Sequence, residues 1–148
     1  MSDGQLRSGR RLAFDYGDVR TGVAVSDFHA IICSPQSVLL TQSPDFALQI
    51  KSLLLEIEPV YIAVGEPRHL SGAESAKMDS VESFHQLLAE LTDLPIYRID
   101  ERMSTVAAQA RLHAGGKNTK ESRATIDAVA ACIILESALA REKSGNLS

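Results

Sequence analysis

The chain has 148 residues, of which 45% are hydrophobic and 23% are charged, and its formal net charge is −4. This length suits a single domain with a substantial core, and no apolar run approaches the roughly 20 residues of a membrane-spanning helix. The acidic balance argues against a protein coated with basic surface, so nucleic-acid binding would have to depend on a local patch of cations.

The termini and the cysteines favour a cytoplasmic protein with no membrane partner. The first residues are polar and basic and lack the apolar segment of a secretory signal. Cys33 and Cys132 have no metal-ligand spacing and are expected to be free thiols. We expect a flexible N-terminal arm over residues 1–10, a single domain over 11–143 and a C-terminal tail over 144–148.

The first half of the chain predicts three strands and a helix. Strands are expected over 11–15 and 22–26, joined by a glycine-punctuated turn that contains Arg20. A third extended segment, 30–40, is broken at Pro35, which suggests an edge position. Ser43 and Pro44 predict the start of a helix that stops at Pro59. Its apolar face would contain Phe46, Ile50, Leu53, Leu54 and Ile57.

The second half alternates strands with helices. A buried parallel strand is expected over 60–64, and a capping box at residues 71–74 opens a helix to about Leu91. A strand over 95–99 is followed by helices over 104–114 and 119–143. This alternation predicts an α/β fold, a mixed sheet with helices on its faces. Active sites of such sheets gather at the carboxyl ends of the parallel strands.

Acidic residues lie at or near three of these strand ends. Asp15 ends the first strand, Glu66 follows the fourth, and Asp100 and Glu101 follow the fifth. A carboxylate on an apolar strand is costly to bury unless donors or a cation meet it. Asp15 therefore either accepts hydrogen bonds from the turn amides or binds a metal with other acids.

The last helix supplies a further acid. Asp127 shares its face with Ala131, Ile134 and Ala138, a face smooth enough to lie close to a sheet. Asp127 could instead interact with the helix dipole or with Arg123. A metal site better explains an acid on a small, apolar face.

Four blocks of sequence, in this order and at these spacings, resemble the YqgF (RuvX) family. They are Asp15–Asp27, Val64–Pro67 with Ser71-Gly72, Asp100–Thr105, and Ile126–Ala131 followed by Ile134-Leu135. The resemblance covers residues 12 to about 139 and implies an RNase H-like fold. The sheet would have five strands in the order 3-2-1-4-5, with helices on both faces.

The resemblance implies a metal-dependent nuclease, a hydrolase acting on ester bonds, in 5′-end processing of pre-16S rRNA during ribosome biogenesis. The alternatives are a Holliday junction resolvase-like DNA endonuclease and a non-catalytic nucleic-acid-binding scaffold. An actin-like ATP-handling protein is disfavoured because such proteins need two domains of this kind. The expected partner is nucleic acid, with pre-rRNA favoured and branched DNA as the alternative, and the chain is expected to be a monomer or a weak homodimer.

By this resemblance the catalytic residues are Asp15, Glu101 and Asp127, and the metal ligands are Asp15, Asp100, Glu101 and Asp127. Two Mg²⁺ or Mn²⁺ ions suit such hard oxygen donors. Asp15 would bridge the metals. Glu101 is favoured over Asp100 because a longer side chain better spans the distance from the fifth strand to the first. Glu66 departs from the family pattern and is either an additional ligand or a solvent-facing loop residue.

The nucleic-acid-binding candidates are cationic side chains near the same edge of the expected sheet. They are Arg20, Arg68, Arg102, Lys117 and Arg123. For the arginines an ordinary surface ion pair is the alternative. The histidines His29, His69, His85 and His113 show no metal spacing and are expected on the surface.

Overall fold

The computed structural model describes residues 8–66, 72–100 and 119–147, and these residues form a five-stranded sheet with helices on both faces. The strands are β1 (Leu12–Asp15), β2 (Arg20–Ser26), β3 (Cys33–Leu40), β4 (Ile62–Glu66) and β5 (Ile96–Asp100). Their order is β3-β2-β1-β4-β5. β1, β2 and β3 pair antiparallel, whereas β4 runs parallel to both β1 and β5. The predicted fold class and strand order are confirmed.

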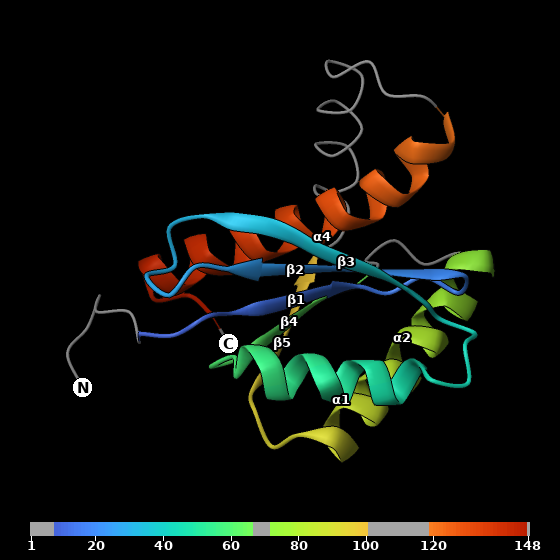
Figure 1. The fold of residues 1–148 in the computed structure, drawn as a ribbon, viewed down its shortest axis with the longest axis horizontal. Helices are drawn as coiled ribbons and strands as arrows, with labels where there is room; N and C mark the ends of the chain where they lie inside the picture. The colour runs from blue at the N-terminus through green and yellow to red at the C-terminus, as the bar shows by residue number, and fades with distance from the viewer. Residues whose placement is uncertain (1–7, 67–71, 101–118, 148) are drawn as a thin grey trace.

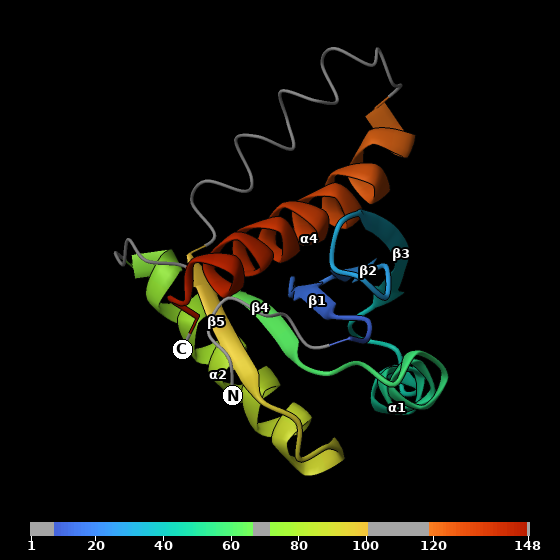
Figure 2. The same ribbon diagram turned by 90° about the vertical axis from the view of Figure 1, so that its left-hand side faces the viewer.

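Three described helices cover the sheet. They are α1 (Phe46–Ile57), α2 (Gly72–Leu91) and α4 (Thr119–Ser144). Figures 1 and 2 show α4 on one face of the sheet and α1 and α2 on the other. The last helix begins where the sequence predicts and ends one residue later. The predicted helix over 104–114 lies outside the described residues. No helix in the described part of the chain combines the length and the apolar character needed to span a membrane.

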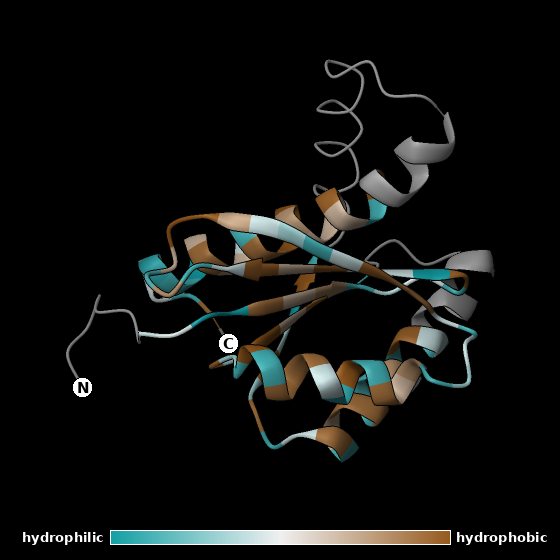
Figure 3. Cartoon of the chain, viewed as in Figure 1, coloured by the Kyte–Doolittle hydropathy of each residue, from teal (hydrophilic) through white to brown (hydrophobic). Residues whose placement is uncertain are grey.

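The two faces of the sheet are packed differently. Toward α1 and α2 the strands present large side chains, among them Leu12 and Phe14, which pack against Phe46 and Phe84. Toward α4 they present Ala13, Ala24 and Ala63, which meet Ala131 and Ala138. Figure 3 shows the resulting hydrophobic strands of the middle layer and the mixed surface of α1. Small residues on both sides of the interface let α4 lie close to the sheet, as predicted for its smooth face.

Several element ends differ from the prediction. The N-cap of α1 is Asp45, whose side chain makes no capping bond. Ser43, the expected cap, accepts a hydrogen bond through Oγ from the Asp45 amide instead. β2 begins at Arg20, and β4 begins at Ile62 and continues through Gly65 to Glu66. The parallel pairing of β4 with β5 extends to Glu66 and Asp100, which explains the longer strand.

The position of the third strand and the extent of the N-terminal arm can also be compared with the prediction. β3 is an edge strand, and its register with β2 shifts opposite Pro35, as the proline suggested. Gly9 donates a backbone hydrogen bond to Phe28, and Arg10 accepts one from Val60. These two residues, assigned to the N-terminal arm by the sequence, therefore belong to the folded part.

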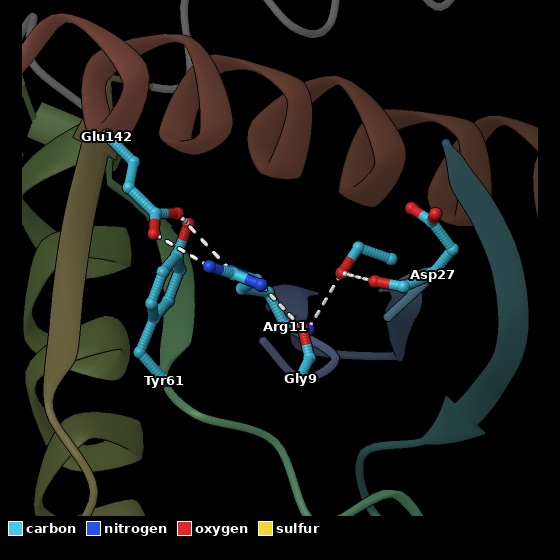
Figure 4. A network of polar contacts seen from close by, with 6 residues as sticks. Gly9, Arg11, Asp27, Tyr61 and Glu142 are labelled. Carbon is cyan, nitrogen blue, oxygen red and sulfur yellow. Dashed lines mark hydrogen bonds and ion pairs between the residues drawn. The ribbon is translucent and has the colours of Figure 1, made fainter. Parts of the chain in front are cut away.

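The carboxyl-terminal end of α4 is tied to the sheet by a buried arginine. Arg11, with no exposed surface, donates through Nη2 and Nε to the two carboxylate oxygens of Glu142, at 2.7 and 3.3 Å. The Tyr61 hydroxyl donates to the same carboxylate at 3.0 Å, and the remaining Arg11 amino group donates to the Gly9 carbonyl. Figure 4 shows Glu142 reaching down from α4 toward the Tyr61 hydroxyl and the Arg11 guanidinium.

Candidate active site

Asp15 and Asp127 lie on the same face of the sheet. Alternation along β1 directs Leu12 and Phe14 toward α1 and α2, and Ala13 toward α4. Asp15, two residues after Ala13, therefore faces α4. Asp127 belongs to α4 itself, close to the point where that helix crosses β2.

Gly22 is the junction between these two acids. It is the register partner of Asp15 across the β1–β2 ladder. A Cβ atom at position 22 would lie 2.0 Å from the carbonyl oxygen of Asp127, closer than any side chain tolerates. The helix backbone thus rests directly on the glycine that pairs with Asp15. The sequence places Gly22 at the start of an expected strand but gives no sign of this contact, which depends on where α4 crosses the sheet.

Arg20 pairs with Asp127. Its Nε donates to Asp127 Oδ2 at 2.8 Å, with the two side chains 34% and 23% exposed. The ion pair expected as the alternative for Arg20 is therefore present, with an acid of the candidate site as its partner. The sequence proposed Arg123 as a partner for Asp127, but the Arg123 side chain lies outside what the structure describes.

The turn that precedes Arg20 is held from the α1 side. Thr41 Oγ1 donates to the Gly17 carbonyl at 2.6 Å, and the Thr41 amide donates to the Val19 carbonyl at 3.0 Å. A Cβ atom at Gly17 would lie 2.5 Å from the carbonyl oxygen of Arg20, so the turn closes tightly only with glycine there. These contacts fix the backbone of the turn and leave the side chain of Arg20 to be positioned by Asp127.

Glu66 lies on the opposite face. It shares the alternation of Ile62 and Val64, which pack toward α1 and α2. Its carboxylate is buried and accepts from Arg98 at 2.8 Å, and Arg98 also bonds Glu82 of α2. The solvent-facing alternative for Glu66 is therefore wrong, and its position does not bring it to Asp15 and Asp127.

Asp100 also faces away from α4. It is the register partner of Glu66, and it follows the alternation that sends Arg98 toward α2 and Tyr97 and Ile99 toward α4. Of the other predicted site residues, Glu101, Arg68, Arg102 and Lys117 lie outside the described residues. The structure thus brings together Asp15, Asp127 and Arg20, and separates Asp100 from them.

His85 corrects the expectation that the histidines lie on the surface. It is buried on α2, and its Nε2 has no hydrogen-bond partner among the described residues. Burial, followed by the charge of Arg98, holds the pKa of His85 below its usual value. His29 is exposed, as expected.

The donor set suits a hard divalent cation. Within residues 8–66, 72–100 and 119–147 no three potential ligands form a cluster. The described part nevertheless supplies two carboxylates on one face, and the guanidinium of Arg20 already holds a positive charge against one of them. Carboxylate oxygens are the ligands that Mg²⁺ and Mn²⁺ prefer.

Comparisons with known proteins show the family of this chain. The family described as "RuvX: Holliday junction resolvase" matches residues 9–141. The protein of Clavibacter michiganensis named "Putative pre-16S rRNA nuclease" is 39% identical over 142 residues, covering 94% of this chain and 88% of that protein. A protein of the same name from Streptomyces coelicolor is 41% identical over 141 residues, covering 94% and 84%.

A solved structure shares the fold. Thermus thermophilus RuvC, in complex with a Holliday junction substrate, matches with a TM-score of 0.61 and 16% identity, covering 95% of this chain and 98% of that one. At this identity the match speaks for the RNase H-like fold alone. The matched span of the family and the identity to its relatives establish the wider relationship: the chain belongs to the RuvX (YqgF) family.

Proposed function

We propose that this chain is a metal-dependent nuclease that hydrolyses phosphodiester bonds, with the 5′ end of pre-16S rRNA as its substrate. The observation that carries the proposal is the close approach of the Asp127 backbone to Gly22. Because Gly22 is the register partner of Asp15, this contact brings the two acids to the same part of the sheet. Family membership and the names of the relatives support the same class of reaction.

The proposed ligands are Asp15, Asp127 and Glu101. Glu101 is preferred to Asp100 because Asp100 faces α2, away from the other two acids. When bound, Mg²⁺ or Mn²⁺ would supply a nucleophilic water at neutral pH and charge for the leaving oxygen. The chain's own part is to hold the carboxylates at one place on a rigid sheet and helix, so that little reorganisation is needed on binding.

Cations would position the nucleic acid around this centre. Among the candidate cations, Arg20 is the one whose side chain lies in the described part of the structure, where it is partly exposed beside Asp127. Arg68, Arg102, Lys117 and Arg123 remain proposed contacts on the strength of the sequence alone. With a net charge of −4, binding is expected to depend on a few such contacts.

Branched DNA is the second candidate substrate, since the matched family is described as a Holliday junction resolvase. The same carboxylates would serve either substrate, because the reacting phosphodiester is alike in both. Incubating the protein with a labelled precursor RNA and with a four-way DNA junction, each in Mg²⁺ and in Mn²⁺, separates the two. Cleavage of the RNA at the mature 5′ end is expected, and cleavage of the junction alone would transfer the assignment to DNA.

The decisive variant is Asp15→Asn, which keeps the shape of the side chain and removes its charge. Cleavage is expected to fall by about two to three orders of magnitude, because metal binding and both charge-dependent steps are lost together. Asp127→Asn should behave alike, whereas the exposed Glu56→Gln on α1 should cut at the parental rate. A melting curve for each protein shows whether a loss of cleavage is due to unfolding of the variant. Parental activity in Asp15→Asn would refute the proposal.

A further inference from the structure

We infer that the Arg20 guanidinium takes the place of the metal ion at Asp127 when no metal is bound, and we call this a metal-substitute role. In the metal-free protein its guanidinium neutralises that carboxylate, and when a divalent cation binds Asp127, Arg20 is released to contact a substrate phosphate. The inference rests on the proposed function, because it takes Asp127 to be a metal ligand. It adds a link between cation binding and nucleic-acid binding.

The geometry gives Arg20 the place of a counter-ion. Its Nε lies 2.8 Å from Asp127 Oδ2. A guanidinium and a divalent cation at the same carboxylate carry like charges and repel each other, so the binding of one disfavours the binding of the other. The contact uses Nε, and among the described residues the two terminal amino groups of Arg20 make no hydrogen bond, while the side chain as a whole is partly exposed. Such paired N–H groups match the oxygens of a phosphate.

Release of Arg20 requires the movement of one side chain. The preceding turn is held by Thr41 and by Gln42, whose Nε2 donates to the Asp18 carbonyl at 2.9 Å. None of these bonds involves the Arg20 guanidinium, so they persist when it leaves Asp127. The pair is also about one-quarter to one-third exposed, and ion pairs at such sites are weak enough to be exchanged.

The thermodynamic consequence is a reciprocal coupling. If cation binding frees Arg20 for phosphate, phosphate binding must in turn favour the cation by the same factor. An arginine that merely lined the site would contribute to nucleic-acid binding equally with and without metal. The coupling therefore separates a metal substitute from an ordinary phosphate contact.

The first measurement is Mn²⁺ affinity without nucleic acid, by calorimetry or electron paramagnetic resonance. Arg20→Gln is expected to bind Mn²⁺ about threefold to fivefold more tightly than the parent, because a competing ion pair worth up to about 1 kcal/mol, or about fivefold, is gone. Arg98→Gln is the matched control. It removes an arginine from a carboxylate pair on the opposite face and is expected to change the Kd by less than about twofold.

The second measurement is a double-mutant cycle on the affinity for a short fluorescein-labelled RNA in EDTA. Asp127→Asn frees Arg20 and is expected to tighten binding, and adding Arg20→Gln should remove most of that gain. Asp15→Asn removes a neighbouring negative charge that is not the acceptor of the Arg20 Nε bond. Combined with Arg20→Gln, it should therefore give nearly additive effects. The contrast distinguishes release of Arg20 from a general change in charge.

The outcomes separate this inference from the proposed function. If Asp127→Asn weakens Mn²⁺ binding while Arg20→Gln leaves the Kd unchanged and both cycles are additive, the inference is overturned and the nuclease proposal stands. If Asp127→Asn and Asp15→Asn both leave Mn²⁺ binding unchanged, both proposals fail. Tighter Mn²⁺ binding in Arg20→Gln, with coupling confined to Asp127, supports the metal-substitute role.

Discussion

The part of α4 that lies on the sheet is attached at each of its two ends by an arginine–carboxylate pair, and the two pairs differ in almost every other respect. Arg11 has no exposed surface and meets both oxygens of Glu142, which also accepts from Tyr61. Arg20 is 34% exposed and meets one oxygen of Asp127 through a single nitrogen. The Arg11–Glu142 pair is buried, with every donor group of Arg11 hydrogen-bonded, and forms the sealed end of this part of α4. The Arg20–Asp127 pair is partly exposed and forms its open end.

From this difference we propose that the first interaction maintains the structure and that the second can rearrange during the reaction. A buried arginine whose partner is lost leaves an uncompensated charge in the interior, so the Arg11 pair cannot be given up cheaply. A partly exposed pair is replaced by water at small cost. The fold can thus keep α4 in place through Arg11 while the charges around Asp127 are rearranged.

The largest effect on stability is expected at the sealed end. Glu142→Gln keeps the size of the side chain but leaves the fully buried Arg11 without its counter-charge, which should lower the free energy of unfolding by about 3–5 kcal/mol. Urea unfolding measures this, with the exposed Glu56→Gln expected within about 0.5 kcal/mol of the parent. A loss below about 1 kcal/mol would show that the network does not hold α4.

A smaller loss is expected where α4 touches the sheet. Gly22→Ala places a Cβ atom 2.0 Å from a backbone oxygen of α4, so the helix must shift, at a cost of about 1–3 kcal/mol. The cleavage rate should fall further than the loss of folded protein accounts for, because the shift separates Asp127 from Asp15. The control is Ser34→Ala, an exposed position on the edge strand. Unchanged cleavage in a folded Gly22→Ala would refute the importance of this contact.

At the open end, Arg20→Gln should lower the free energy of unfolding by no more than about 1 kcal/mol, since the pair is solvated. The measurement is the same urea titration, run beside Glu142→Gln. A loss as large as that of Glu142→Gln would mean that the two ends are equally structural, and the comparison would fail.

The last prediction concerns the region between these two pairs, where Cys33 of β3 lies near Cys132 of α4, and it requires no substitution. Burial, and then the charge of Glu136, raise the pKa of Cys33 to about 12. The thiol is therefore protonated at pH 8, and the folded protein should react with iodoacetamide far more slowly than the chain in guanidinium. Rapid alkylation of the folded protein at pH 8 would show that α4 opens readily from β3.

The strand and helix pattern could be predicted from the sequence because periodicity and breakers act locally. The face that each acid occupies could be predicted less well. Residues 60–64 form a continuous apolar run, so nothing in them tells which side Glu66 and its neighbours face, and its partner Arg98 lies 32 residues further on. Family resemblance named Asp15, Asp127 and the pair Asp100–Glu101, and the preference for Glu101 over Asp100 came from side-chain length rather than from the face of the sheet that each occupies.

The contacts that assemble the site were beyond sequence reasoning for a related reason. Arg20 and Asp127 are 107 residues apart, and their pairing depends on the angle at which α4 crosses β2. Gly22 carries no side chain whose chemistry could indicate its role. Arg11 stands at the start of a strand, next to the arm expected from the sequence, and its buried position follows from the cover that α4 provides.

The distance between Arg11 and Glu142 along the chain also has a consequence for the order of folding. They are 131 residues apart, and α4 follows every strand of the sheet in sequence. During synthesis the hairpins of β1, β2 and β3 leave the ribosome long before the helix that covers their alanine face, and such distant contacts form slowly. We therefore expect Asp15 to remain without Asp127 until synthesis is nearly complete, so that a partly made chain has no nuclease activity.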